Sequence, residues 1–293
     1  MLCFVVAFAE EARPIIDHFR LKLVPGVNAF SLFTGEEKRL IVSGPGKNRA
    51  AQAVAYLAGW LKAQKSTAWL NVGIAGHETL ELGTGVLASK ISDAEHKQNW
   101  YPPLTFDWQE MRLPVMTVTK PEEIYSEGFL YEMEASGFYE AAIRFSTAEL
   151  IQCYKIISDN QKSPISNVSP ESARTLINKN LDAIDKLSAA LSNRSGTLEA
   201  LGQPAQLFEQ LVKQWHFTAT EEHRLNRLLK RIETLGLLRA SDITERLKQL
   251  NKAQDVLTTL EKELNCAPIT FSHFPSPPKG ERAAIQASGE GKN

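Results

Sequence analysis

The chain has 293 residues, which is enough to bury one large hydrophobic core or two smaller ones. Hydrophobic residues make up 43% and charged residues 23%, and the formal net charge is −1; this composition argues against a general nucleic-acid-binding or membrane-surface protein. The cysteines are scattered without metal-ligand spacing, so we expect neither a disulfide framework nor a metal site.

The apolar run over residues 2–8 predicts a first strand that is covered on both faces. No basic segment precedes this run, and charge follows it at Glu10, so it is too short for a signal peptide or a membrane-spanning helix. We therefore expect a cytoplasmic protein.

Strands and helices alternate through the first two thirds of the chain. Helical spacing over 10–19 precedes a predicted hairpin over 29–34 and 38–43, and an alanine-rich helix over 48–61 follows. The next predicted elements are strands over 67–73, 85–92 and 113–119, a helix over 134–145, a strand over 150–158 and a helix that begins at Ser169-Pro170. This order predicts an α/β domain over 1–192, with a mixed, largely parallel central sheet flanked by helices.

The pattern changes near residue 192, where strand-like runs largely disappear. Helical spacing and a capping-box signature at Thr218 and Glu221 predict a C-terminal α-helical module over 197–265. Its basic residues alternate with glutamates, which favours a solvated amphipathic face, with a partner-binding or dimerisation helix as the alternative. The tail over 275–293 is rich in proline, glycine and polar residues and is predicted to be disordered.

Five short motifs follow one another in the first domain. They are Ala7-Phe8-Ala9-Glu10-Glu11 after the first strand, the glycine turns Gly44-Pro45-Gly46-Lys47 and Gly73-Ile74-Ala75-Gly76, the string Tyr131-Glu132-Met133-Glu134-Ala135, and the strand end Ser158-Asp159-Asn160. Glycine turns permit close backbone approach to a ligand, and strand ends of open α/β sheets are where ligands bind. Lys47 and Arg49 after the first turn are expected to be helix-surface charges.

In this order the motifs resemble the purine nucleoside phosphorylase/uridine phosphorylase superfamily, and most of all its methylthioadenosine/S-adenosylhomocysteine (MTA/SAH) nucleosidase branch. The resemblance covers about residues 1–192. It implies a nucleoside phosphorylase-like fold and cleavage of the N-glycosidic bond of a purine nucleoside, without a cofactor. It also implies a small-molecule nucleoside substrate, no nucleic-acid or membrane partner, and a homo-oligomer, with a dimer favoured.

The resemblance also implies roles for particular residues. Asp159 would protonate the leaving base, Glu134 would hold the ribose hydroxyls with Met133 against the sugar, and Glu11 would orient the attacking water. The second glycine turn (Ile74, Ala75 and Gly76) and Ser158 would lie beside the substrate. The residues themselves leave other roles open. Asp159 could be a turn residue, and Glu134 could be a glutamate that only stabilises the helix start. Glu132 could take the place of Glu134, and Glu10 that of Glu11.

The sequence departs from the family pattern at two places. Ile74 stands where family members often carry serine, and no arginine precedes that turn, which favours hydrolysis over phosphorolysis. No clear equivalent of the purine-stacking aromatic residue follows the strand over 113–119. The aromatic loop over 100–108 is therefore a candidate source of rings that stack on the base; the alternative is that these rings pack onto the core.

Three functions remain open for this chain: a nucleosidase, a phosphate-dependent phosphorylase, and a catalytically weak nucleoside-binding regulatory protein.

Overall fold

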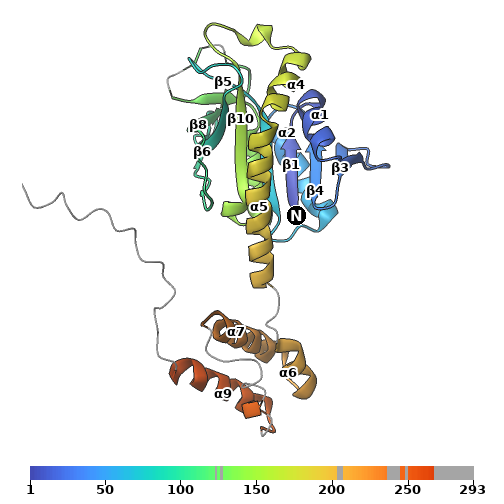
Figure 1. Cartoon of the computed structure of the whole chain (residues 1–293), viewed down its shortest axis with the longest axis vertical. Coiled ribbons are helices and arrows are strands. Elements are labelled where there is room, and N and C mark those ends of the chain that lie inside the picture. Colours follow the sequence, from blue (N-terminus) through green and yellow to red (C-terminus); the bar gives the residue numbers. More distant parts are fainter. Residues whose placement is uncertain (123, 126–127, 203–206, 236–244, 248–249, 267–293) are drawn as a thin grey trace, which may run out of the picture. The chain divides into compact units, whose positions relative to one another are not determined.

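The structure, a computed structural model, describes residues 1–122, 124–125, 128–202, 207–235, 245–247 and 250–266 (Figure 1). The predicted disordered tail over 275–293 lies outside these residues. The chain divides into two compact units, Met1–Gly202 and Gln203–Asn293. Among the described helices, none is both long and apolar enough to cross a membrane.

The first unit is built on a mixed sheet, as the alternation of strands and helices predicts. Its strands follow the order β10-β6-β8-β9-β5-β1-β4-β3-β2, and β7 pairs with β6. The strands are β1 (Leu2–Val6), β2 (Lys22–Leu23), β3 (Ser31–Thr34), β4 (Lys38–Val42), β5 (Ala68–Gly76), β6 (Gly85–Asp93), β7 (Asn99–Trp100), β8 (Arg112–Thr117), β9 (Leu130–Glu132) and β10 (Ile151–Asp159).

Two features of this sheet position the site. β1 pairs in parallel with β4 and β5, and β5 pairs in parallel with β10, so β1, β5 and β10 point the same way. β10 also pairs with β6, in antiparallel sense, so that β10, β6, β8, β9 and β5 close into a ring. Every residue of β1 and β10 is buried, which explains the continuous apolar sequence of β1, whereas β10 also buries polar side chains, including Lys155 and Asp159.

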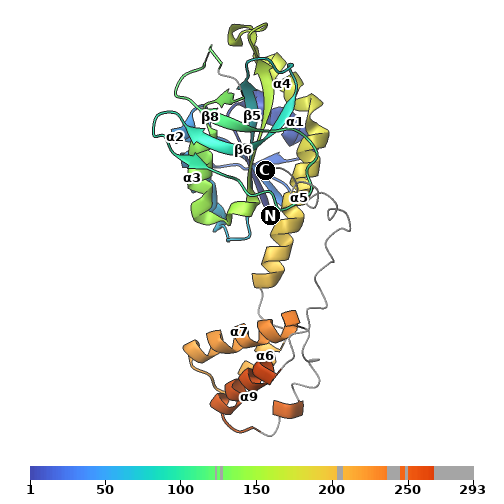
Figure 2. The ribbon, with the colours of Figure 1, turned by 90° about the vertical axis from the view of Figure 1, so that its left-hand side faces the viewer.

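Helices cover both faces of the sheet (Figure 2). The helices α2 (Lys47–Leu61) and α3 (Ala135–Phe145) pack on one face, where Val54, Leu57 and Phe138 join the core. On the other face, α1 (Ala9–His18), α4 (Pro170–Lys179) and α5 (Leu181–Gly202) contribute a second cluster that includes Ile15 and Leu187. Short 3₁₀ turns, η1 (Ala148–Leu150) and η2 (Ile165–Asn167), flank β10.

The helix α5 runs through the stretch in which the sequence indicates a change of character. Ser195 is buried there; its hydroxyl donates to the carbonyl oxygen of Ser66 at 2.5 Å and accepts a hydrogen bond from the amino group of Met1 at 3.2 Å. Ser195 therefore ties this part of α5 to Met1 and Ser66 within the first unit, and the helix continues to Gly202.

The described residues of the second unit form helices, as predicted. It contains α6 (Phe208–Gln214), α7 (Ala219–Leu235) and α9 (Ala253–Cys266), which share a core that includes Leu211, Leu225 and Leu257. The predicted capping box begins α7, since the Thr218 backbone N–H and hydroxyl both donate to Glu221 Oε2, at 2.9 and 2.8 Å.

Candidate functional site

A cavity of about 170 Å³ lies at the carboxyl ends of β1, β5 and β10. These three strands are parallel, so their carboxyl ends lie at the same edge of the sheet (Figure 1). All of the site residues predicted from the sequence line it: Glu11, Ile74, Ala75, Gly76, Met133, Glu134, Ser158 and Asp159. The other lining residues are Phe8, Pro45, Val118, Pro121, Glu122, Tyr125, Tyr131, Glu132 and Ile165.

Glu11 enters the cavity from the first turn of α1 and is only 2% exposed, whereas Glu10 is exposed. Backbone amides fix its carboxylate: the N–H of Phe8 donates to Oε2 at 3.0 Å and the N–H of Ile74 donates to Oε1 at 3.1 Å. Burial, and then the negative charge of Glu134, raise the pKa of Glu11 to about 7, against the opposing effect of Lys155. A carboxyl with this pKa can exchange a proton near neutral pH.

Glu134 stands at the N-cap of α3, separated from the end of β9 only by Met133, and is buried. Its Oε1 accepts a hydrogen bond from the N–H of Gly46 at 2.9 Å, so the first glycine turn holds the carboxylate in place. Burial raises the pKa of Glu134; Lys155 opposes the rise and Glu132 adds to it. The carboxylate therefore faces the cavity at a fixed position.

Glu132, the competing candidate, is a structural partner of the helix start. Its Oε2 accepts hydrogen bonds from the backbone N–H groups of Glu134 and Ala135, at 2.9 and 2.8 Å. Its Oε1 accepts one from the Thr117 hydroxyl at 2.6 Å. These bonds satisfy amides at the N-terminus of α3 and fix the direction in which Glu134 leaves the backbone.

Lys155 is a buried cation that sequence reasoning missed. It lies in the middle of β10, with a side chain that is 1% exposed, and its Nζ is 2.8 Å from Glu132 Oε2 and 3.9 Å from Glu134 Oε2. Burial alone would lower the pKa of Lys155, but the neighbouring negative groups, Glu132 foremost, raise it above its ordinary value. A lysine between Tyr154 and Ile156 on a strand that is expected to be buried is a signal for such a site, because a buried charge requires a partner.

Asp159 ends β10 and is 1% exposed. The hydroxyl of Ser158 donates to its Oδ1, and the phenol of Tyr125 donates to its Oδ2. The turn after the strand uses the next residue instead, since Asn160 Oδ1 accepts hydrogen bonds from the N–H groups of Lys162 and Ser163, at 2.9 and 3.0 Å. Asp159 is thus left facing the cavity.

The aromatic side chains at the cavity are Phe8, Tyr125 and Tyr131, and none comes from the loop over 100–108. In that loop, Trp100 contacts the Tyr139 ring at 6.4 Å between centroids, and Trp108 contacts the Tyr154 ring at 6.1 Å. The idea that this loop supplies stacking rings is therefore wrong, because these indoles pack onto the core. Tyr125 was missed because the segment after β8 has no periodic pattern.

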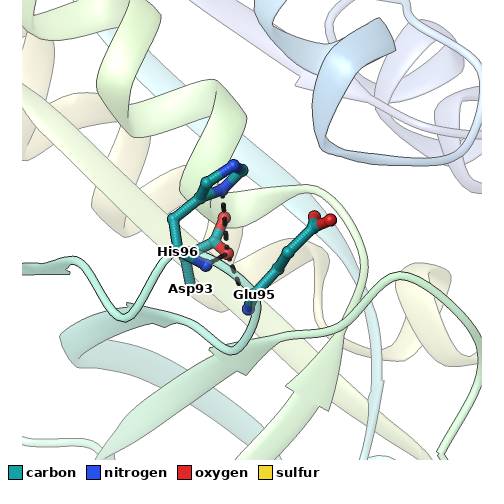
Figure 3. Close-up of side chains that lie close together, drawn as sticks. All are labelled: Asp93, Glu95 and His96. Carbon is teal, nitrogen blue, oxygen red and sulfur yellow. Dashed lines mark hydrogen bonds and ion pairs between the residues drawn. The ribbon is translucent and has the colours of Figure 1, made fainter.

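A second polar cluster at the end of β6 has the residue types of a metal site. Asp93, Glu95 and His96 lie close together, and Asp93 accepts hydrogen bonds from the backbone N–H groups of the other two (Figure 3). Lys47 Nζ already lies at its centre, 2.9 Å from Asp93 Oδ2, 2.7 Å from Glu95 Oε2 and 3.2 Å from His96 Nδ1. An ammonium thus supplies the positive charge that a metal would bring.

This cluster joins three elements and corrects one prediction. Lys47 begins α2, and its side chain is 13% exposed, so it is a partly buried ion-pair partner and not the helix-surface charge expected from sequence. Ser136 in α3 donates its hydroxyl to Asp93 Oδ2 at 2.9 Å. Although burial would raise it, the pKa of Asp93 lies well below its usual range because of the bonds from His96, Lys47 and Ser136.

Comparisons with known proteins agree with the fold. No protein-family model and no curated protein sequence matches the chain. Among solved structures, an MTA/SAH nucleosidase superposes with a TM-score of 0.53 at 13% identity, covering 65% of this chain and 95% of its own. A nucleosidase of the same type from Chlamydia trachomatis gives a TM-score of 0.51 at 17% identity, over 65% of this chain and 98% of its own. The chain therefore contains the fold of the MTA/SAH nucleosidases.

Proposed function

We propose that the cavity hydrolyses the N-glycosidic bond of a purine nucleoside of the methylthioadenosine or adenosylhomocysteine type. The observation that carries this proposal is the convergence of Glu11, Glu134 and Asp159 on one cavity from three separate segments of the chain. Cleavage of an N-ribosidic bond needs a group that activates water, a group that stabilises the sugar and a group that delivers a proton to the base.

Glu11 is assigned to water. Its carboxylate accepts backbone hydrogen bonds at both oxygens, and its pKa of about 7 suits a general base that works near neutral pH. In the reaction, Glu11 takes a proton from water while the water oxygen forms a bond to the anomeric carbon of the sugar.

Glu134 is assigned to the ribose. One of its oxygens is bonded to Gly46, and each carboxylate oxygen can accept more than one hydrogen bond, so capacity remains for sugar hydroxyls. Its negative charge would stabilise the positive charge that develops on the sugar. Met133, next to it in the lining, is assigned to the apolar face of the sugar.

Asp159 is assigned to the leaving base. As the bond between the anomeric carbon and the base nitrogen breaks, its electron pair passes to the base, and Asp159 delivers a proton to the ring. Water supplies one proton to Glu11, and the base receives one from Asp159, so the products are free base and free sugar. Transfer of a proton from Glu11 back to Asp159, through solvent, restores the starting state.

Hydrolysis is favoured over phosphorolysis by the charge of the lining. Binding of phosphate usually employs arginine, lysine or a cluster of backbone amides. Among the described lining residues there is no arginine, lysine or histidine, and Ile74 offers no hydroxyl. Lys155 lies behind the carboxylates and is paired with Glu132. A phosphorylase therefore remains the second candidate, and a binding protein with little turnover the third.

The test is chromatographic detection of free base from methylthioadenosine, adenosylhomocysteine, adenosine and inosine, each with and without phosphate. We expect release without phosphate, and a loss of ~100-fold or more in Asp159→Asn. Glu10→Gln is the control: like Asp159→Asn it replaces a carboxylate by an amide, but Glu10 is exposed, so this variant should retain turnover. Release only with phosphate would identify a phosphorylase, and tight binding without release would identify a binding protein.

The organisation of the chain and its assembly are also proposed. We infer that residues up to the end of α5 form the catalytic unit and that the helical unit has a separate role. A homodimer in a cytoplasmic setting is the assembly we expect, and light scattering on the full-length chain would test the dimer.

A further inference from the structure

Asp93 is a buried carboxylate that has no part in the proposed reaction. It ends β6 and is 5% exposed. Lys47 Nζ donates to its Oδ1 at 3.0 Å and to its Oδ2 at 2.9 Å, and the Ser136 hydroxyl also donates to Oδ2, at 2.9 Å. Lys47 is the first residue of α2 and Ser136 is the second residue of α3, so Asp93 bridges the starts of these two helices.

The same two helix starts hold the carboxylate that is assigned to the ribose. Gly46, whose N–H donates to Glu134 Oε1 at 2.9 Å, directly precedes Lys47, and Glu134 stands two residues before Ser136. Asp93 is therefore connected to both partners of this hydrogen bond through residues that are one or two positions away in the chain. A shift of one helix start relative to the other would change the position of the Glu134 carboxylate.

The two helix starts are also in direct contact through their main chains. A Cβ atom at Gly137 would lie 2.0 Å from the carbonyl oxygen of Lys47, so only glycine lets α3 approach α2 this closely. Packing of this kind limits how near the helices come to each other. Hydrogen bonds are directional, so the bonds to Asp93 can also fix how one helix start is placed along the other.

Burial makes Asp93 the stronger of the two carboxylates that bind Lys47. The Lys47 side chain is 13% exposed and Ser136 is 1% exposed, so the bonds to Asp93 are charge-assisted and largely shielded from water. Glu95 lies 2.7 Å from the same ammonium, but its side chain is 56% exposed, and water weakens such a pair. Asp93 is thus the carboxylate that can hold the two helix starts together.

We propose that Asp93 is a positioning residue for Glu134: it fixes the starts of α2 and α3 so that the Glu134 carboxylate meets the ribose hydroxyls. This inference rests on the proposed function, because it takes the ribose as the group that Glu134 binds. Misplacement of a binding group by ~1 Å can cost ~100-fold in rate. Asp93→Asn keeps the size of the side chain but removes its charge, and should therefore weaken recognition of the ribose.

The experiment measures kcat/KM of the full-length protein for methylthioadenosine and for its 2′-deoxy analogue, which lacks one of the hydroxyls assigned to Glu134. The ratio of the two values reports the contact with the ribose and does not depend on the fraction of protein that is folded. We expect Asp93→Asn to lower this ratio ~10-fold. Ser136→Ala is a smaller change that should lower the ratio in the same direction, and it decides the question if Asp93→Asn does not fold.

Glu95→Gln is the matched control. It makes the same replacement of a carboxylate by an amide on the exposed partner of Lys47, and should keep the wild-type ratio. A lower ratio in Asp93→Asn and Ser136→Ala, but not in Glu95→Gln, would support the inference.

The remaining outcomes separate this inference from the proposed function. A wild-type ratio in both Asp93→Asn and Ser136→Ala, or an equal loss in Glu95→Gln, would overturn the inference and leave the proposed function standing, since Asp93 would then only stabilise the fold. If the wild type did not distinguish the two nucleosides, or released base from neither, the ribose role of Glu134 would fall and the inference with it.

Discussion

Ionisation of Glu11 should set a pH dependence of stability that can be measured without any substrate. Burial and the charge of Glu134 place the pKa of Glu11 at about 7 in the folded protein, against an ordinary value of 4.5. At ~1.4 kcal/mol for each pKa unit, ionising this carboxyl costs the folded state ~3 kcal/mol relative to the unfolded chain. The substitution that isolates this cost is Glu11→Gln, which cannot ionise.

The sign follows from the direction of the shift. Because the pKa is raised on folding, the contribution of Glu11 to stability is fully present below about 4.5 and is lost as the pH rises through about 7. The glutamine variant lacks this loss. Between pH 4 and pH 8, the free energy of unfolding of Glu11→Gln should therefore rise by ~3 kcal/mol relative to wild type.

The assay is urea denaturation of both full-length proteins at pH 4 and pH 8, at one ionic strength. Glu10→Gln serves as the control, because Glu10 is exposed on the same helix turn and should leave the pH dependence of wild type in place. A difference between Glu11→Gln and wild type that stays constant from pH 4 to pH 8 would refute the reasoning, since it would mean that Glu11 is not a buried carboxyl beside Glu134.

Three further predictions concern turnover and the two ion-paired lysines. Turnover by wild type should increase as the pH rises toward about 7, because Glu11 must lose its proton to act as the base. A kcat/KM profile without this rise would exclude Glu11 as the base. Lys155→Met should lower the free energy of unfolding by ~3–5 kcal/mol, because it leaves the Glu132 carboxylate buried without its cation. Urea denaturation would measure this change, and a loss under ~1 kcal/mol would contradict the ion pair. Lys47→Met should lower the melting temperature and raise the pKa of Asp93, and an unchanged Asp93 titration by NMR would show that the ion pair does not form.

Much of the fold was predictable because local pattern and tertiary structure agree. The apolar run of β1 is buried throughout, and the acidic string before α3 begins a helix, as predicted. The sequence indicates a change of pattern near residue 192, and α5 continues through this position to Gly202. A cluster of polar residues often marks the end of a helix. Within α5, however, the Ser195 side chain is hydrogen-bonded to Ser66 and Met1, and no local sequence pattern predicts contacts this far apart in the chain.

The sequence predicts some residues of the candidate site and not others. Residues in recognisable motifs, such as Glu11 and Asp159, lie at the cavity where strand order and direction bring their segments together. Lys155 and Tyr125 were missed because their roles depend on partners far away in sequence, namely Glu132 for the lysine and Asp159 for the phenol. The pairing of Lys155 depends on the register of β10, and the pairing of Tyr125 depends on the path of the chain after β8.

The central claim is that water attacks the sugar in this cavity, and isotope transfer tests it most directly. Full-length protein would be incubated with methylthioadenosine in phosphate-free H₂¹⁸O, and the released sugar analysed by mass spectrometry before its anomeric oxygen exchanges with solvent. We expect free adenine in equal amount and one ¹⁸O atom in each sugar. Absence of adenine, or release that begins only when phosphate is added and yields a sugar phosphate, would contradict the account.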